Sequence, residues 1–174
     1  MKKVFFLPIL LTFMFAFSST VSAQVNWSDL SKAQEMARQQ HKKIMIKVYT
    51  NWCGWCKQMD ANTFSNDFVS KYLNDNYICI KFNAESSEKV VFDGKTYGKT
   101  GNYHDLVSRW MGNQFVYPTT ILLDENGNLI QAIQGYFAPN DFEKIATYFA
   151  SNSHLSTPWQ TYSQNYHRPN GNVK

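Results

Sequence analysis

Cys53 and Cys56 are the two residues of this sequence whose types and spacing most directly indicate chemistry. They lie in the stretch Asn-Trp-Cys-Gly-Trp-Cys-Lys, residues 51–57, between an apolar β-branched run over residues 44–50 and a segment with a helical pattern. Two cysteines three positions apart in the first turn of a helix share a face and lie close enough to bridge. The helix N-terminus stabilises a thiolate there, which is the species that attacks disulfides. The pattern therefore favours thiol–disulfide exchange.

The same spacing is found in half of a zinc site, which needs two further ligands. The only other cysteine is Cys79, and the four histidines are scattered singly: His41, His104, His154 and His167. A purely structural disulfide is a second alternative, although a three-residue loop restrains little of the unfolded chain. We expect no bound metal and no cofactor, and redox chemistry remains the favoured interpretation.

The first 23 residues predict an export signal. They contain Lys2 and Lys3, an apolar run over residues 4–17 and the small-residue stretch Val-Ser-Ala at 21–23, the three parts of a secretory signal peptide. The apolar run is too short to span a bilayer comfortably, and no later stretch approaches that length. We expect a mature protein that starts at Gln24, has no membrane span, and is periplasmic or secreted.

Composition limits what the mature chain does. Removal of the signal leaves 174 − 23 = 151 residues, the length of one domain. The formal charge falls from +4 to +2 because two lysines are lost, so nucleic acid binding has no electrostatic footprint. One Cys-x-x-Cys pair in an oxidising compartment, without a larger even set of cysteines, indicates an enzyme acting on the thiols of other proteins.

Hydrophobic periodicity and turn residues predict the elements around the cysteines. We expect helices up to about residue 40, through the cysteines to about 62, and over 67–73, 104–111 and 139–150, with strands over 44–50, 77–82, 119–123 and 129–134. Asn26 or Ser28 is the expected cap of the first helix. The first two strands and the helix between them form a right-handed βαβ unit, whose strand ends meet at the sheet edge where sites gather. For residues 151–174 we expect an irregular tail, partly pinned by its aromatic residues.

This order of elements, together with three motifs, resembles the thioredoxin superfamily. The motifs are Trp-Cys-Gly-Trp-Cys-Lys over residues 52–57 after a strand, Tyr-Pro-Thr over 117–119 at the start of the third strand, and Gly135 after the hairpin. The resemblance covers about residues 25–150. It implies an α/β thioredoxin fold over residues 24–150, a central mixed sheet flanked by helices, with a β-hairpin insertion before a cis-proline.

The resemblance also implies roles. Cys53 is the exposed attacking thiolate and Cys56 resolves the mixed disulfide, which agrees with the closer position of Cys53 to the helix N-terminus. Pro118 carries a cis peptide after Tyr117 and lies against the cysteines, whereas an ordinary strand-start proline is the alternative. Trp52, Gly54, Trp55 and Tyr117 are the remaining residues expected to shape the site or contact substrate.

Two positions depart from the family pattern. Trp55 lies between the cysteines where thioredoxins carry proline, which leaves the redox potential undetermined. Lys47 occupies the place, six residues before Cys53, where thioredoxins bury an acid. We consider three alternatives for Lys47. If its ammonium lies charged under the site, it stabilises the thiolate and makes the protein more oxidising; if it is buried and neutral, it can act as the base for the resolving thiol. If the side chain extends to solvent, it has no role in the reaction. Cys79, in the middle of a strand, we interpret as a packing residue.

Residues 84–101 are an insertion in which Asp93-Gly94 predicts a hairpin over residues 90–97. It follows the end of a strand parallel to the one that precedes Cys53, so we expect it to form a wall of the substrate site. A solubilising surface loop is the alternative. If it forms a wall, replacing residues 84–101 by a short linker is expected to leave the fold and the reaction with small dithiols nearly intact while changing the turnover of protein clients.

These observations predict an exported, monomeric protein thiol–disulfide oxidoreductase, a reductase or isomerase rather than an oxidase. Its partners are proteins with thiols or disulfides and a redox protein that supplies or accepts electrons. A redox-silent peptide-binding module is the alternative from another class, although the intact Cys-x-x-Cys pair argues against it. A thiol-based copper chaperone is a third, and needs a histidine near Cys53 and Cys56.

Overall fold

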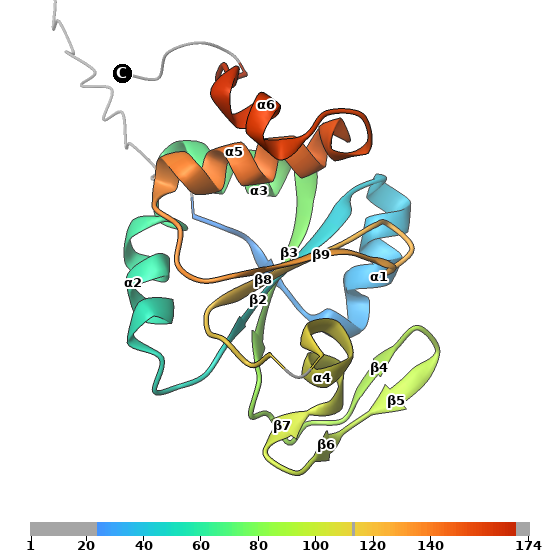
Figure 1. Cartoon of the computed structure of the whole chain (residues 1–174). Coiled ribbons are helices and arrows are strands. Elements are labelled where there is room, and N and C mark those ends of the chain that lie inside the picture. Colours follow the sequence, from blue (N-terminus) through green and yellow to red (C-terminus); the bar gives the residue numbers. More distant parts are fainter. Residues whose placement is uncertain (1–23, 113, 170–174) are drawn as a thin grey trace, which may run out of the picture.

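The computed structural model describes residues 24–112 and 114–169, so the predicted signal peptide, residues 1–23, lies outside the described residues. A five-stranded mixed sheet forms the centre, with strands in the order β1 (Trp27–Ser28), β3 (Tyr77–Asn83), β2 (Lys43–Tyr49), β8 (Thr119–Leu123) and β9 (Leu129–Gln134). The first three strands are parallel to one another, β8 is antiparallel to β2, and β9 is antiparallel to β8. Helices cover both faces (Figure 1). The α/β fold with a central mixed sheet is thus confirmed.

Two hydrophobic cores lie on opposite faces of the sheet. Helices α1 (Leu30–Gln40) and α4 (Asp105–Met111) cover one face, where Ile44, Ile46 and Val48 of β2 are buried. Helices α2 (Gly54–Asn62), α3 (Asp67–Asn76) and α5 (Pro139–Ala150) cover the other, against Met45. Because side chains alternate along a strand, Lys47 of β2 is directed to the same face as Met45, toward α2.

The capping residue of α1 differs from the expectation. Asp29, rather than Asn26 or Ser28, is the N-cap, and its Oδ1 accepts a hydrogen bond of 2.8 Å from the backbone N of Ser31. The helix begins one residue after Asp29 because an N-cap carboxylate satisfies a backbone N–H that no carbonyl can reach. None of the helices in the described residues is long and apolar enough to cross a membrane.

The insertion contains the predicted hairpin, formed by β4 (Val90–Phe92) and β5 (Lys95–Tyr97), which pair antiparallel. A second short pair, β6 (Lys99–Thr100) with β7 (Tyr103–His104), follows it. The hairpin packs on the α1 and α4 face of the sheet rather than beside the cysteines (Figure 1). Phe92 is fully buried there, edge-to-face with Trp110 of α4 at 5.5 Å between ring centroids.

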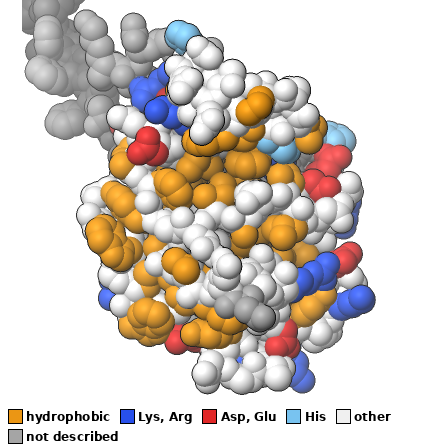
Figure 2. Space-filling model, in the orientation of Figure 1, with side chains coloured by type: hydrophobic (Ala, Val, Ile, Leu, Met, Phe, Trp, Pro, Cys, Tyr) orange, Lys and Arg blue, Asp and Glu red, His pale blue; other side chains and the backbone are white. Residues whose placement is uncertain are grey.

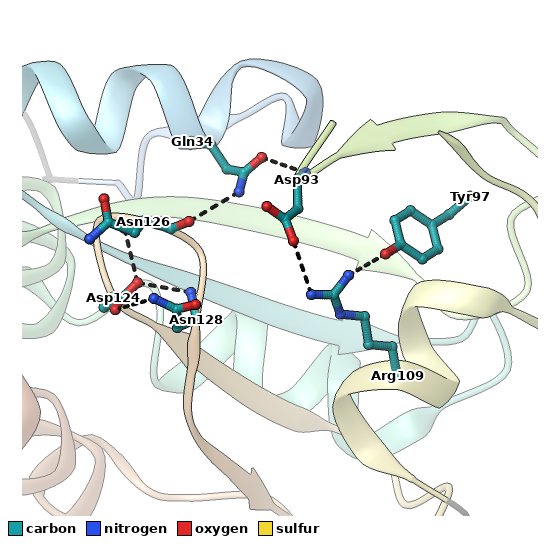
Figure 3. Close-up of polar contacts among 7 residues, drawn as sticks. All are labelled: Gln34, Asp93, Tyr97, Arg109, Asp124, Asn126 and Asn128. Carbon is teal, nitrogen blue, oxygen red and sulfur yellow. Dashed lines mark hydrogen bonds and ion pairs between the residues drawn. The ribbon is translucent and has the colours of Figure 1, made fainter. Parts of the chain in front are cut away.

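Polar contacts hold the hairpin in this position, as Figure 3 shows. Gln34 of α1 accepts a 2.8 Å hydrogen bond from the backbone N of Asp93, and donates at 3.3 Å to the carbonyl of Asn126 in the β8–β9 turn. Arg109 of α4 contacts the carboxylate of Asp93 and the hydroxyl of Tyr97. One side chain of α1 therefore joins two turns that are far apart in the sequence.

The burial of Phe92 in the core argues against the expectation that residues 84–101 can be replaced without cost to the fold. The β4–β5 hairpin also does not form the predicted wall of the substrate site, since it packs on the α1 and α4 face. Glu85, at the base of the insertion, is the residue that contacts the motif, by accepting a 3.0 Å hydrogen bond from the indole of Trp52.

The stretch after α5 is ordered, so the expectation of an irregular tail is wrong up to residue 169. It contains a 3-10 turn, η1 (Ser153–Leu155), and α6 (Trp159–Gln164). Aromatic residues attach it to α5, as expected: Trp159 and Tyr162 both contact the ring of Tyr148. Arg168 then forms two hydrogen bonds, of 2.7 and 2.6 Å, to the buried carboxylate of Glu143 on α5.

We predict that Phe92→Ala lowers the free energy of unfolding by about 3–5 kcal/mol, the usual range for removing a buried phenylalanine. Val91→Ala is the matched control, because Val91 is on the same strand and 56% exposed, and it should cost less than about 1 kcal/mol. Urea unfolding followed by circular dichroism measures both. Equal effects of the two substitutions would show that the hairpin is only a surface loop.

Candidate active site

The two cysteines form a disulfide at the start of α2, with 5.3 Å between their Cα atoms. Cys53 is the N-cap residue of the helix, and the backbone N of Cys56 donates a 3.1 Å hydrogen bond to its Sγ. This N–H belongs to the first turn, where backbone donors have no partner within the helix. The same donor is in place to stabilise a thiolate on Cys53 after reduction.

Accessibility around the disulfide differs from what we expected. Cys53 is only 5% exposed and Cys56 is 2% exposed, so the expected exposure of Cys53 is wrong in this disulfide form, although the order of the two is as predicted. The neighbouring tryptophans cover the surface instead: Trp52 is 66% exposed and Trp55 is 59% exposed. These two indoles are therefore the large apolar side chains that the motif presents to a partner.

Each indole has a defined partner from another part of the chain. Trp52 donates to Glu85 and contacts the ring of Tyr117 edge-on, with 6.0 Å between centroids. Trp55 lies 5.5 Å from the ring of Tyr136, which follows β9. The aromatic rim of the site, Trp52, Trp55, Tyr117 and Tyr136, is thus assembled from three separate segments.

The peptide bond between Tyr117 and Pro118 is cis, which confirms that part of the prediction. The carbonyl of Pro118 accepts a 2.8 Å hydrogen bond from the backbone N of Gly135. Gly135 has φ 103°, a conformation that suits glycine. Burial, with smaller contributions from Tyr103 and Glu85, raises the pKa of Tyr117 to about 12, so its hydroxyl is protonated at neutral pH.

Gly54 is the first residue of α2 and faces open space, since a Cβ there would meet nothing within 4 Å. The structure therefore shows no steric requirement for glycine at this position. Cys79, by contrast, is fully buried in the core on the α2 side, and burial raises its thiol pKa. It is a free cysteine packed away from the surface, in line with the packing role expected for it.

Lys47 is fully buried beneath α2, so the alternative in which it extends to solvent is wrong. Its Nζ donates a 2.8 Å hydrogen bond to the carbonyl of Cys56 and lies 2.7 Å from Oδ1 of Asp60. The other oxygen of Asp60 pairs with Lys81 of β3 at 3.0 Å. Burial lowers the pKa of Lys47, and the contact with Asp60 opposes that shift by stabilising the ammonium.

Asp60, Lys81, Glu85 and Tyr136 are site residues that the sequence reasoning missed. Asp60 had a usable signal, because it lies four residues after Cys56 and therefore on the same face of the helix, and a charge on a buried face requires a partner. Lys81 and Asp60 carry opposite charges, so the group formed with Lys47 has a net charge of one positive unit under the disulfide.

Comparison with known proteins assigns the fold. The sequence model described as the thioredoxin-like domain matches residues 30–150. A thioredoxin-fold protein from Helicobacter pylori superposes with TM-score 0.57 at 15% identity, over 79% of this chain and 89% of that one. A thioredoxin from Thermus thermophilus gives TM-score 0.55, also at 15% identity, over 84% of this chain and 99% of that one. At these identities the likeness concerns the fold alone.

Curated relatives match over short parts of much longer proteins. Mouse spermatogenesis-associated protein 20 is 30% identical over 59 residues, which are 34% of this chain and 8% of the mouse protein. The thiol:disulfide interchange protein DsbD of Actinobacillus pleuropneumoniae is 27% identical over 116 residues, 65% of this chain and 17% of that protein. This chain therefore spans only a small fraction of either relative.

We predict that Lys47→Met raises the pKa of the reduced Cys53 thiol by about one unit, because it removes a positive charge from a poorly solvated position under α2. Lys71→Met is the matched control, since Lys71 is exposed on α3 and pairs with the neighbouring Asp75 on the same helix. Thiolate absorbance against pH measures the titration. If both variants titrate like the parent, Lys47 has a purely structural role.

Proposed function

This chain belongs to the thioredoxin-like domain family, and from that membership and its site we propose that it is a thiol–disulfide oxidoreductase that reduces or isomerises disulfides in protein clients. The observation that carries the proposal is the Cys53–Cys56 disulfide at the N-terminus of α2, capped by Cys53 itself and flanked by two exposed indoles. A disulfide in this place forms and breaks with little movement of the backbone.

Reduction of a client begins from the dithiol form. The Cys53 thiolate, stabilised by the backbone N–H of Cys56, attacks one sulfur of the client disulfide. A bond forms between Cys53 and that sulfur, the client S–S bond breaks, and the second client sulfur leaves as a thiolate that takes a proton from water. The product is a mixed disulfide between Cys53 and the client.

Cys56 completes the exchange. Its thiolate attacks the sulfur of Cys53, the bond to the client breaks, and the client leaves as a thiol after taking up a second proton. Two electrons have moved from the Cys53–Cys56 pair to the client disulfide, and the pair is left oxidised, as in the structure. A dithiol protein is then needed to reduce it again, which makes a redox partner part of the proposal.

Contacts around Cys56 support its role as the resolving residue. It is the less exposed of the two cysteines, and its carbonyl is held by the buried ammonium of Lys47. A fixed, covered thiol reacts with Cys53 in the same chain more readily than with a second client molecule, because its partner is held close by. Lys47 is accordingly a positioning residue.

The direction of the redox reaction and the compartment in which the protein acts are also part of what we propose. The name of the Actinobacillus relative describes thiol:disulfide interchange, and we extend to this chain a reducing or isomerising role. The pattern of residues 1–23 supports export to a periplasm or to the exterior, where client disulfides are stable. We retain the expectation that the protein acts as a monomer on clients that it meets there.

The proposal predicts that Cys56→Ser accumulates mixed disulfides with client proteins through Cys53, because attack remains possible and resolution does not. Cys53→Ser is the matched control and should trap far less, since Cys56 is the less exposed cysteine and lacks the N-cap position that stabilises the Cys53 thiolate. Non-reducing gels of the two reduced variants, mixed with native disulfide-linked insulin as the client, measure the trapped fraction. Equal trapping by both variants would contradict the assigned roles.

Insulin reduction by the parent protein separates the enzyme from a redox-silent binding module on the same fold. Turnover with a dithiol reductant is expected, and it should be lost in both cysteine variants. Binding of clients without turnover would instead favour the peptide-binding module.

A further inference from the structure

A second concave surface lies away from the disulfide, between β9, α5 and the C-terminal extension, residues 151–169. Its cavity has a volume of about 510 Å³, within the range of specific ligand sites. Figure 2 shows hydrophobic side chains gathered on this side of the molecule, below the C-terminal extension. We call it the β9 groove, and it is lined by Ile130, Gln131, Ile133, Phe137, Ile145, Tyr148, Phe149, His154 and Trp159.

One lip of the groove is a sheet edge with which no strand pairs among residues 24–112 and 114–169. β9 is the last strand of the sheet, and its six residues, Leu-Ile-Gln-Ala-Ile-Gln, include no charge and no proline. Proteins usually protect such edges with lysine, proline or a covering segment, because the free N–H and C=O groups pair with other extended chains. The opposite edge, β1, has only two residues, so the long neutral edge is the one beside the cavity.

The lining carries no charge. Burial, followed by the nearby charge of Lys43, lowers the pKa of His154 and so favours its neutral ring. His154 and Trp159 come from the extension, beyond the end of the family match at residue 150. The C-terminal extension therefore completes a groove whose other lining residues belong to the family domain.

The groove is connected to the aromatic rim of the redox site. Tyr136, which contacts Trp55 beside the cysteines, is followed directly by Phe137, which lines the groove. The carbonyl of Phe137 accepts a 2.6 Å hydrogen bond from the hydroxyl of Thr63 at the end of α2. Two consecutive residues of one loop thus contact the aromatic rim and line the groove.

We propose that the β9 groove binds an extended, uncharged and apolar segment of the client whose disulfide is being exchanged at Cys53. The segment adds as a strand to the edge of β9 and places alternate apolar side chains in the cavity, a known mode of peptide recognition. This proposal rests on the proposed function, because it names the kind of client that the redox site serves.

A second copy of this chain fits the groove less well than a client. Six residues of strand extend about 20 Å, and such an edge alone buries far less than the roughly 1,200–2,000 Å² of a stable interface. A client held at the disulfide needs much less area, because its local concentration near the groove is already high. The continuity through Tyr136 and Phe137 therefore favours the client.

The test uses two synthetic peptides with the same intramolecular disulfide, joined by a glycine–serine spacer to six apolar residues or to six charged ones. Each peptide is made in two versions, one with the six-residue segment on the N-terminal side of the disulfide and one with it on the C-terminal side. The parent should reduce the apolar peptides with about tenfold lower KM. Ile133→Glu places a charge in the groove, and should lower the ratio of kcat/KM for the apolar peptide to that for oxidised glutathione by about tenfold.

Two further variants make the result unambiguous. Gln131→Glu introduces the charge at an exposed groove position that does not threaten the fold, and should shift the ratio in the same direction. Val91→Glu places the same charge on an exposed apolar residue of the β4–β5 hairpin, away from the groove, and should leave the ratio unchanged.

If the parent and the three variants all gave the same ratio of kcat/KM values, the proposal would be overturned. It would also be overturned if sedimentation showed a concentration-dependent dimer that Ile133→Glu dissociates, because the occupant of the groove would then be a second copy of the chain. Failure of the parent to reduce oxidised glutathione and every peptide would instead count against the proposed function. Reduction of all peptides at one rate would leave that function standing and remove the groove from client choice.

Discussion

The buried ammonium of Lys47 is the constraint on which the arrangement of this site depends. A charge inside the central strand of a sheet is tolerated only when it is paired and hydrogen-bonded. Here both partners, the carbonyl of Cys56 and the carboxylate of Asp60, come from α2. Meeting the requirement of one side chain therefore fixes the first and second turns of α2 against β2. The same contacts hold the disulfide at the edge of the sheet where β2 ends and β8 begins, the edge at which the cis peptide of Pro118 precedes β8.

Turn and capping residues in the sequence correctly predicted the elements whose ends they define. The strands β8 and β9 and the helix α5 have the predicted bounds, because Asp-Glu-Asn-Gly-Asn defines the turn between the strands and Pro139 suits the first turn of a helix. The hairpin of the insertion was likewise readable from Asp93-Gly94. The position of the hairpin could not be predicted, because it depends on the tertiary contact between Phe92 and Trp110 of α4.

The residues of the site likewise fall into those that the sequence predicted and those that only tertiary contacts bring in. The positions of Cys53, Cys56 and Pro118 follow from spacing and from family resemblance, whereas Glu85 and Tyr136 enter the site through tertiary contacts with Trp52 and Trp55. No sequence period relates these pairs. The C-terminal extension was misjudged for a related reason: its composition is polar, as in a tail, but its few aromatic residues are spaced to contact one helix, α5. Composition averages over such residues and conceals them.

The charges under the disulfide also bear on the direction of the reaction. A lone buried ammonium stabilises the thiolate form, and stabilising the reduced form makes a disulfide more oxidising. Asp60 offsets this effect, because its carboxylate lies between Lys47 and Lys81 and pairs with both. The carboxylate therefore weakens the effect of Lys47 on the thiols without cancelling it, because two ammonium groups share one carboxylate. A weaker effect of this kind is what the proposed reducing or isomerising role requires.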